Sequence, residues 1–182
     1  MIVVMAGVAG SGKTTEGLLL ARRLGWAFAD GDEFHPAASV AKMRAGLPLT
    51  DADRGPWLQA IVAWMKAKAA AGESAVVACS ALKRRYREQL LSADPAVRMV
   101  FLVIPHDADE ARLGTRQGHF FPQQLLDSQF ADLELPDKAE NVLVVPATGT
   151  AEQTSDEIMR RLGLAPGPDD PPGPDDPPAP AT

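Results

Sequence analysis

The sequence predicts an α/β protein of three layers, in which a five-stranded parallel sheet is flanked by helices. Two observations lead to this fold class. Apolar runs of the length of a buried strand alternate along the chain with stretches of helical periodicity, which is typical of a parallel sheet. The chain of 182 residues, 46% of them hydrophobic, also has the size and composition of one globular domain.

The predicted strands are short runs of almost entirely apolar residues, at 2–6, 26–29, 75–79, 99–104 and 142–145. Between them, apolar residues at three- and four-residue spacing predict helices at 13–24, 36–45, 56–71, 82–92, 107–115, 122–131 and 151–162. The clearest helix is predicted to begin at Pro56, because proline is tolerated in a first turn, and to end at Gly72.

The composition changes after residue 164. Residues 165–182 are rich in Pro and Asp, and the run Gly-Pro-Asp-Asp-Pro-Pro occurs at 167–172 and again at 173–178. Such a segment lacks the large apolar side chains of a core, and its prolines remove backbone donors. We therefore predict one domain over residues 1–164, followed by a disordered tail over 165–182.

Charge and cysteine content narrow the class of protein. The formal net charge is −6, but the last 18 residues contain four Asp and no Lys or Arg, so the rest of the chain is nearly neutral. A nucleic-acid-binding domain is usually strongly basic, so no nucleic-acid partner is expected. No apolar run approaches the roughly 20 residues that span a bilayer, so we expect a cytoplasmic protein without membrane contact. The single cysteine, Cys79, excludes an internal disulfide.

The first predicted strand runs directly into a phosphate-binding loop. Residues 7–14 satisfy the pattern G-x-x-x-x-G-K-[ST], and a predicted helix follows. Glycines let such a loop turn its N–H groups inward around phosphates, and the helix N-terminus adds a favourable dipole. Lys13 is expected on the β and γ phosphates, and the Thr14 hydroxyl on Mg²⁺. The predicted ATP-binding residues of this segment are Gly7, Val8, Ala9, Gly10, Ser11, Gly12, Lys13, Thr14 and Thr15.

Carboxylates follow the second predicted strand, at 30–33, on the sheet edge where open α/β folds bind ligands. Asp32 is the candidate base for an acceptor hydroxyl. Many P-loop proteins hold Mg²⁺ with an Asp after the third strand, but here that strand ends Ala78-Cys79-Ser80. Asp32 is therefore predicted to join Thr14 as a metal residue, which favours a small-metabolite kinase over GTPases and motors. A solvated acidic turn is the alternative, and His35 is either a site residue or a helix-entry residue.

Cationic residues gather in the connections at the same edge, and they suit an anionic acceptor. Arg54 is the better candidate among them, because Thr50 and Asp53 resemble a helix-start cap that would fix its position. Asp51 and Asp53 are interpreted as caps. Solvated helix faces remain an alternative for the other cations, which are Lys42, Arg44, Lys83, Arg84 and Arg85.

A hinged lid is predicted at about residues 112–123. Arg112 and Arg116 are four residues apart on one helix face, and the run 117–122 breaks that helix. Lid arginines can close over ATP and neutralise the charge that develops on the transferred phosphoryl group while water is excluded. A solvated arginine pair is the alternative.

Several segments together resemble the P-loop gluconokinases of the thermoresistant type, over residues 1 to about 163. They are 7–14, 30–36, 42–43, 46–54, 56–58, 79–83, 86–87, 116–121, 128–130 and 133–134. The resemblance implies a P-loop kinase fold with a helical lid, ATP and Mg²⁺ as cofactors, phosphorylation of D-gluconate at its 6-hydroxyl and a homodimer. It implies Lys13, Asp32 and Arg116 as catalytic residues, and a substrate site of Asp32, His35, Lys42, Arg54, Lys83 and His119.

Two other functions stay open from the sequence. A shikimate-kinase-like enzyme shares an Asp near this place in its second strand, although the runs 50–54 and 118–121 weigh against it. A regulatory module that binds ATP without transferring phosphate is the alternative from another class.

Overall fold

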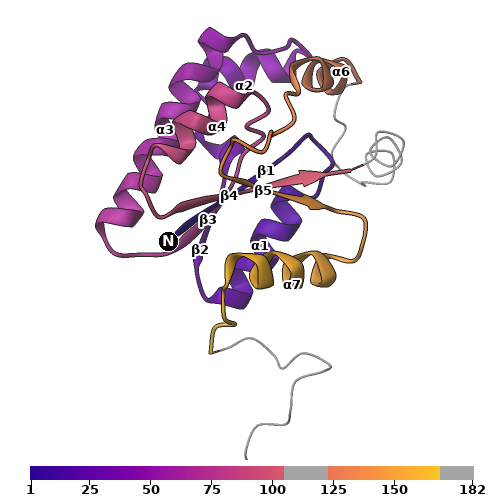
Figure 1. Cartoon of the computed structure of the whole chain (residues 1–182). Coiled ribbons are helices and arrows are strands. Elements are labelled where there is room, and N and C mark those ends of the chain that lie inside the picture. Colours follow the sequence, from indigo (N-terminus) through magenta and orange to yellow (C-terminus); the bar gives the residue numbers. More distant parts are fainter. Residues whose placement is uncertain (105–122, 169–182) are drawn as a thin grey trace, which may run out of the picture.

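A single sheet of five parallel strands forms the centre of the protein, in the order β2-β3-β1-β4-β5 (Figure 1). The computed structural model describes residues 1–104 and 123–168. The strands are β1 (Ile2–Ala6), β2 (Ala27–Asp30), β3 (Ala75–Ala78), β4 (Val97–Val103) and β5 (Val142–Pro146). Each overlaps a predicted strand, so the parallel five-stranded sheet is confirmed.

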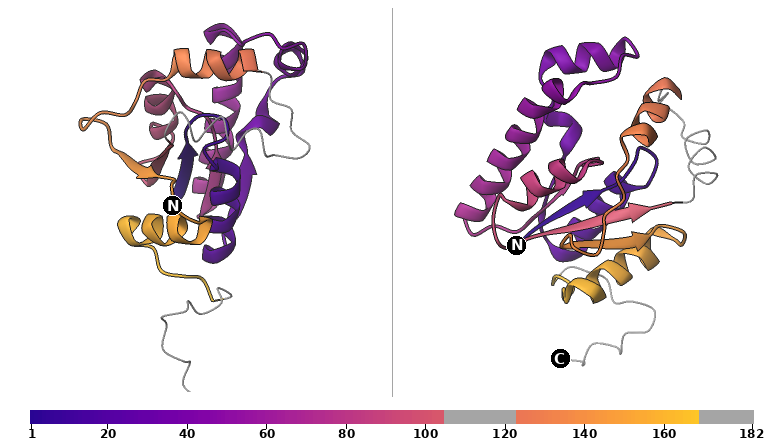
Figure 2. Two further views of the ribbon diagram at one scale, coloured as in Figure 1. Left: turned by 90° about the vertical axis from the view of Figure 1, so that its right-hand side faces the viewer. Right: turned by 45° about the horizontal axis from the view of Figure 1, so that its top comes forward.

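The helices enclose this sheet. They are α1 (Lys13–Leu24), the short 3₁₀ helix η1 (Gly31–Phe34), α2 (Ala37–Arg44), α3 (Asp51–Ala70), α4 (Arg84–Leu91), α6 (Gln123–Asp132) and α7 (Ala151–Leu162). Helices α1 and α7 pack together on one face of the sheet, while α3 and α4 cover the other face (Figure 2). The predicted three layers are therefore present, and the predicted helix at 107–115 lies outside the described residues.

Strand β1 is completely buried and lies between β3 and β4. The chain runs from β1 to the edge strand β2, returns to β3 beside β1 and then crosses to β4 on the other side of β1. In open α/β sheets the crevice beside the carboxyl ends of the strands at such a switch point is where ligands bind. The loops after β1, β2 and β3 open at this edge, and they carry the phosphate loop, the Asp30–Asp32 run and Lys83.

Helix α3 begins earlier than predicted, at Asp51 instead of Pro56. The Thr50 side chain accepts the Asp53 N–H, and the Asp53 carboxylate accepts the Thr50 N–H, so a complete capping box starts the helix there. Pro56 consequently lies inside the helix. The buried side chains of Trp57, Leu58, Ile61 and Met65 anchor α3 to the core and offset the missing proline N–H.

A residue just beyond the predicted boundary at 164 contacts the domain. The Gly167 N–H donates to the Arg23 carbonyl at 2.7 Å, at the end of α1. The rest of the proposed tail, residues 169–182, lies outside the described residues. Within the described part of the chain, no helix has both the length and the apolar character needed to cross a bilayer.

Candidate functional site

The phosphate loop connects β1 to α1, and its shape depends on glycine. Gly7, Gly10 and Gly12 all have positive φ, at 139°, 84° and 94°. A Cβ on Gly7 would lie 2.7 Å from the Leu102 carbonyl oxygen, so no side chain fits there. The loop is also tied to β3, because the Gly7 N–H donates to the Ser80 carbonyl at 3.2 Å. These contacts hold a backbone cradle of the kind that surrounds phosphate groups.

Lys13 and Thr14 are the first residues of α1, at the mouth of this loop. The Lys13 ammonium donates to the Val8 carbonyl at 2.7 Å and so reaches back across the loop. The Thr14 hydroxyl donates to Asp30 Oδ2 at 3.1 Å. The predicted phosphate and metal residues of this loop therefore lie together with a carboxylate.

That carboxylate belongs to Asp30, whereas the sequence predicts Asp32 as the carboxylate that joins Thr14. Asp30 is the last residue of β2, which brings its side chain next to the start of α1. Asp32 lies two residues further on in η1, with 87% of its side chain exposed, and its N–H donates to Asp30 Oδ1 at 3.0 Å. Asp30 therefore contacts Thr14, and Asp32 lines the same cavity from η1.

Gly31 makes this sharp exit from β2 possible, because a Cβ there would lie 2.2 Å from the Ala78 carbonyl oxygen. Its own carbonyl accepts the Trp57 indole N–H at 2.7 Å. The Trp57 ring stacks on His35 at a centroid distance of 4.4 Å. Trp57 thus fixes both the Asp30–Asp32 turn and the histidine beside it.

His35 is buried beside Asp32, with 5% of its side chain exposed. Its Nε2 lies 4.0 Å from Asp32 Oδ1, and within the described residues its Nδ1 has no hydrogen-bond partner. Burial lowers the pKa of His35, against the opposing effect of the Asp32 charge. The imidazole is therefore held neutral near neutral pH, where it can donate or accept a hydrogen bond.

These groups line one cavity of about 460 Å³, large enough for a small metabolite and a phosphate group. Lys13, Thr14, Asp30, Asp32 and His35 line it from the loops after β1 and β2. Its further lining residues are Ala9, Gly10, Met43, Pro48, Leu49, Arg54, Trp57, Ala78, Cys79, Ser80, Leu82, Tyr86, Ser128 and Gln129. The structure therefore brings half of the predicted site residues of the described segments into one hollow.

A cluster of charges lies at the side of this cavity formed by α3, α4 and the end of α6. Asp132 accepts from Arg54 at 2.6 Å with one carboxylate oxygen and pairs with Lys83 at 2.8 Å with the other. Asp51 pairs with Lys83 at 3.2 Å and also contacts Tyr86 Oη and Arg85. Two cations predicted to bind the acceptor are thus held together by acidic side chains of the protein.

The charges in this cluster stabilise one another. Burial opposes ionisation of Asp132, but hydrogen bonds from Lys83 and Arg54 outweigh it and lower its pKa. The hydrogen bond to Asp132 raises the pKa of Lys83. A hydrogen bond from Tyr86 lowers the pKa of Asp51, so this residue does more than begin α3. Both cations therefore remain charged throughout the physiological range.

Other predicted residues are not brought to the cavity. Lys42 pairs with Asp53 of the capping box at 2.7 Å and is absent from the cavity lining. Lys83 is also absent from the cavity lining, but it contacts Tyr86, which does line the cavity. Arg112, Arg116, His119 and the predicted lid lie outside the described residues, apart from Gln123, the first residue of α6.

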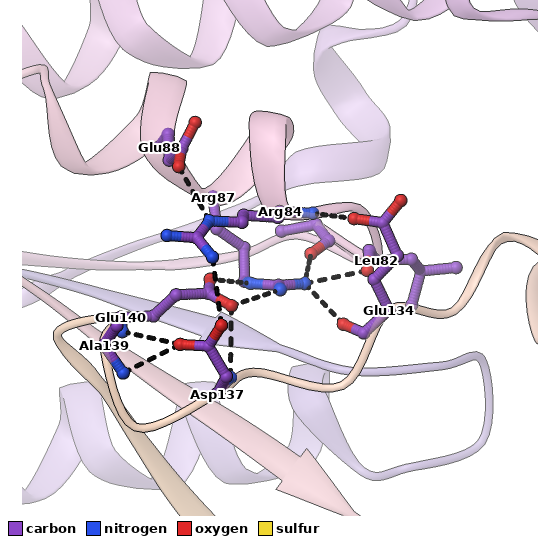
Figure 3. Close-up of polar contacts among 9 residues, drawn as sticks. Leu82, Arg84, Arg87, Glu88, Glu134, Asp137, Ala139 and Glu140 are labelled. Atoms are coloured by element: carbon purple, nitrogen blue, oxygen red, sulfur yellow. Dashed lines mark hydrogen bonds and ion pairs between the residues drawn. The ribbon is translucent and has the colours of Figure 1, made fainter.

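A buried arginine fastens the loop before α4 to the segment after α6 (Figure 3). Arg87 is fully buried and makes a bidentate ion pair with Glu140, at 2.7 and 2.8 Å. It also donates to the carbonyls of Leu82 and Glu134, both at 2.8 Å. Because Lys83 follows Leu82 directly, Arg87 fixes the loop that presents this cation.

We expect Arg87→Met to lower the free energy of unfolding by about 3–5 kcal/mol, because it leaves Glu140 buried and unpaired. Thermal unfolding measures the change, with Arg84→Met as the control, since Arg84 lies on the surface of the same helix. The Arg87 hydrogen bonds lower the pKa of Glu140, so this stabilisation should be complete above the ordinary pKa of a glutamate and decline as the pH falls below it. Equal unfolding temperatures for Arg87→Met and the parent would contradict this prediction.

A second hollow of about 290 Å³ lies against the outer side of the phosphate loop. It is lined by Gly10, Ser11, Gly12, Thr15, Glu16, Ala147, Gly149 and Ala151. The residues after β5 were not identified from the sequence as part of a site, since nothing in their composition marks them. Their position beside the loop makes this hollow suitable for the nucleoside part of a nucleotide.

Across residues 1–104 and 123–168, no group of three or more His, Cys, Asp or Glu side chains could hold a metal ion. The Thr14 hydroxyl and the Asp30 carboxylate nevertheless fit Mg²⁺, which commonly takes only one or two protein ligands and completes its shell with phosphate oxygens and water.

Comparison with known proteins identifies the family, although no protein-family model matches the chain. A gluconokinase of Gluconobacter oxydans (strain 621H) is 46% identical over 158 residues, which cover 87% of this chain and 89% of the relative. The thermoresistant gluconokinase of Escherichia coli (strain K12) is 40% identical over 164 residues, covering 87% and 94%.

Solved structures that resemble this chain point to the same family. The crystal structure of a gluconokinase from Sinorhizobium meliloti 1021 matches with a TM-score of 0.80 and 37% identity, and covers 88% of this chain and 90% of that one. A shikimate kinase from Aquifex aeolicus matches with a TM-score of 0.57 at 19% identity, over 90% of this chain and 96% of that one, which shows the fold alone. The predicted resemblance is confirmed, and the chain belongs to the gluconokinase family.

Proposed function

We propose that this protein transfers the terminal phosphoryl group of ATP to the 6-hydroxyl of D-gluconate, giving 6-phospho-D-gluconate and ADP. The observation that carries the proposal is the single cavity in which the phosphate loop, the Asp30–Asp32 turn and the Arg54 cluster meet. A phosphate-binding loop alone suits many enzymes, whereas cations in the same cavity suit an acceptor that carries a carboxylate. The curated relatives that share most of the chain are named gluconokinases.

On the phosphate side of the cavity, the side chains and N–H groups of the protein position the phosphates of ATP and neutralise their charge. Inward N–H groups of the loop and the Lys13 ammonium would hold the β and γ phosphates. Thr14 and Asp30 would hold Mg²⁺, which would neutralise charge on the phosphate oxygens. Asp30 is thereby proposed as a metal residue in addition to Thr14.

On the acceptor side, Asp32 is proposed to accept the proton of the attacking hydroxyl. Its carboxylate lines the cavity, and the ion pair that the described residues offer it is weak. The partner is His35, whose Nε2 lies 4.0 Å away and whose lowered pKa favours the neutral imidazole. His35 is fixed by Trp57 and offers a polar ring edge to a polyol. Arg116 of the lid stays a prediction for stabilising the transferred group, as Arg112 does for ATP and His119 for gluconate.

Arg54 and Lys83 are proposed to bind the gluconate carboxylate. Asp132 holds both of these cations, one with each of its two carboxylate oxygens. A substrate carboxylate offers the same pair of oxygens, so gluconate would compete with Asp132 for these cations or join them at the cavity edge. Lys42 is proposed only as an outer contact, because Asp53 already holds it.

Removing one of these cations should weaken acceptor binding and spare nucleotide binding. We expect Lys83→Met to raise the gluconate KM by about tenfold or more, because a hydrogen bond to a charged group contributes roughly 1.5–3 kcal/mol. The KM for ATP should stay within about twofold. Lys68→Met is the matched control, because Lys68 pairs with Glu73 near the end of α3, away from the cavity. A raised KM for ATP with an unchanged KM for gluconate would move Lys83 to the nucleotide side.

An assay of ADP release across a panel of acceptors tests the proposed function directly. Gluconate should raise ADP release well above the rate without an acceptor, while shikimate and nucleoside monophosphates should not. Turnover of shikimate alone would support the alternative kinase, and ATP binding without turnover of any acceptor would support a regulatory module. Light scattering on the purified protein tests the homodimer, which stays a prediction from the resemblance, as does the cytoplasmic location.

A further inference from the structure

Helix α6 reaches across the site and contacts the phosphate loop directly. The Ala9 N–H, in the middle of the loop, donates to Gln129 Oε1 at 2.7 Å, although the two residues are 120 positions apart in the sequence. Gln129 and Ala9 both line the 460 Å³ cavity, together with Lys13 and Asp30. A side chain outside the phosphate-loop motif is therefore part of the wall where the phosphate groups are expected.

The chemistry of this contact fixes the orientation of the amide. A backbone N–H can only donate, so the Gln129 atom facing Ala9 has to be the carbonyl oxygen. The two N–H donors of Nε2 are then the polar atoms that Gln129 has left for the cavity. The Nε2 atom itself presents only donors, which suit an oxygen that carries negative charge.

We propose that Gln129 is a further catalytic residue, whose Nε2 donates a hydrogen bond to an oxygen of the transferred phosphoryl group. This inference rests on the proposed function. As the phosphoryl group passes between oxygens, charge spreads over its peripheral oxygens, and a donor already aimed at one of them stabilises the transition state. The bond from Ala9 holds the amide in place before ATP binds, so little reorganisation is needed when the charge develops.

A simpler role is that Gln129 only braces the loop by accepting the Ala9 N–H. The two roles differ in which half of the amide matters. Gln129→Glu keeps an oxygen that can accept from Ala9 but removes both donors, and Gln129→Met removes both halves at similar size. A bracing role predicts that Gln129→Glu keeps more turnover than Gln129→Met, because only the former retains an acceptor for Ala9, whereas a donor role predicts that Gln129→Glu loses at least as much as Gln129→Met.

The experiment measures kcat and both KM values for the full chain and for these two variants, with melting temperatures to confirm folding. We expect kcat to fall at least about tenfold in Gln129→Met and further in Gln129→Glu, whose charge repels the phosphate oxygens, while the gluconate KM changes less than about threefold. Ala131→Gln on the exposed side of α6 is the control and should match the parent. A Gln129→Glu variant with more than half of the parent kcat would overturn the proposal.

A second measurement separates this inference from the proposed function. Slow ATP hydrolysis without an acceptor passes the same phosphoryl group to water, so the variants can be compared in it whatever the acceptor is. The Gln129 variants should show the same order of losses in hydrolysis. Failure of the parent to phosphorylate gluconate would count against the proposed function alone, and equal hydrolysis by all three proteins would count against Gln129 alone.

Discussion

Lys13→Ala should lower kcat by at least about 100-fold while the protein remains folded. The ammonium already lies across the phosphate loop, donating to the Val8 carbonyl at 2.7 Å, so it is in place to follow the phosphates through the reaction. Interactions that strengthen as charge develops act mainly on the transition state, and loss of one preorganised donor typically costs 10²–10³ in rate. Steady-state kinetics with ATP and gluconate measure the effect.

The exposed Lys66 of α3 provides the control, because Lys66→Ala removes the same group from the surface. A thermal melt of each variant shows whether lost activity reflects lost structure. If a folded Lys13→Ala protein turned over at the ordinary rate, the phosphate loop would not hold the reacting group, and the assignment of the whole motif would be wrong.

Asp32→Asn should separate chemistry from binding. The substitution keeps the size of the side chain and removes its charge, so kcat should fall by about 100-fold or more if the carboxylate accepts the hydroxyl proton. Gluconate binding, measured by calorimetry with a non-hydrolysable ATP analogue, should weaken much less. The exposed neighbour Glu33 gives the control substitution Glu33→Gln.

The same measurements on Asp30→Asn distinguish the two carboxylates. Asp30 contacts the Thr14 hydroxyl, so its loss should raise the Mg²⁺ concentration needed for half-maximal activity, a change not expected for Asp32→Asn. An Asp32→Asn enzyme with unchanged kcat would transfer the role of base to another group, with His35 the nearest candidate. Equal losses in binding and turnover would reduce Asp32 to a residue that positions the acceptor.

The sequence was most informative where one short segment determines a structure. The phosphate loop could be predicted because its glycines, lysine and threonine are contiguous, and the strands because each is a short run of buried residues. The start of α3 at Asp51 differs from the predicted start at Pro56 because the capping box of Thr50 and Asp53 sets it, whereas the buried apolar residues of the helix begin only at Trp57.

The contacts that complete the site join distant parts of the chain, and no local pattern announces them. Choosing Asp30 over Asp32 as the partner of Thr14 requires the exact exit of β2, which depends on the close approach of Gly31 to β3. Two further contacts depend on the position of α6, which is set by tertiary packing. They are the contact of Asp132 with Arg54 and that of Gln129 with Ala9. The cations Arg54 and Lys83 could therefore be predicted from the sequence, whereas their acidic partner Asp132 could not.

The buried cysteine that follows β3 can report how often the folded protein opens locally. Cys79 is the only cysteine, it is 2% exposed, and burial raises its pKa to about 12, so in the folded chain its thiol is both covered and protonated. A thiol reagent should therefore modify it only during excursions that open the wall of the cavity that Cys79 lines. The rate of modification then measures how often those excursions occur, without an introduced label. A nucleotide or sugar acid that binds only the closed chain should slow the reaction in proportion to its occupancy, which gives an affinity independent of turnover.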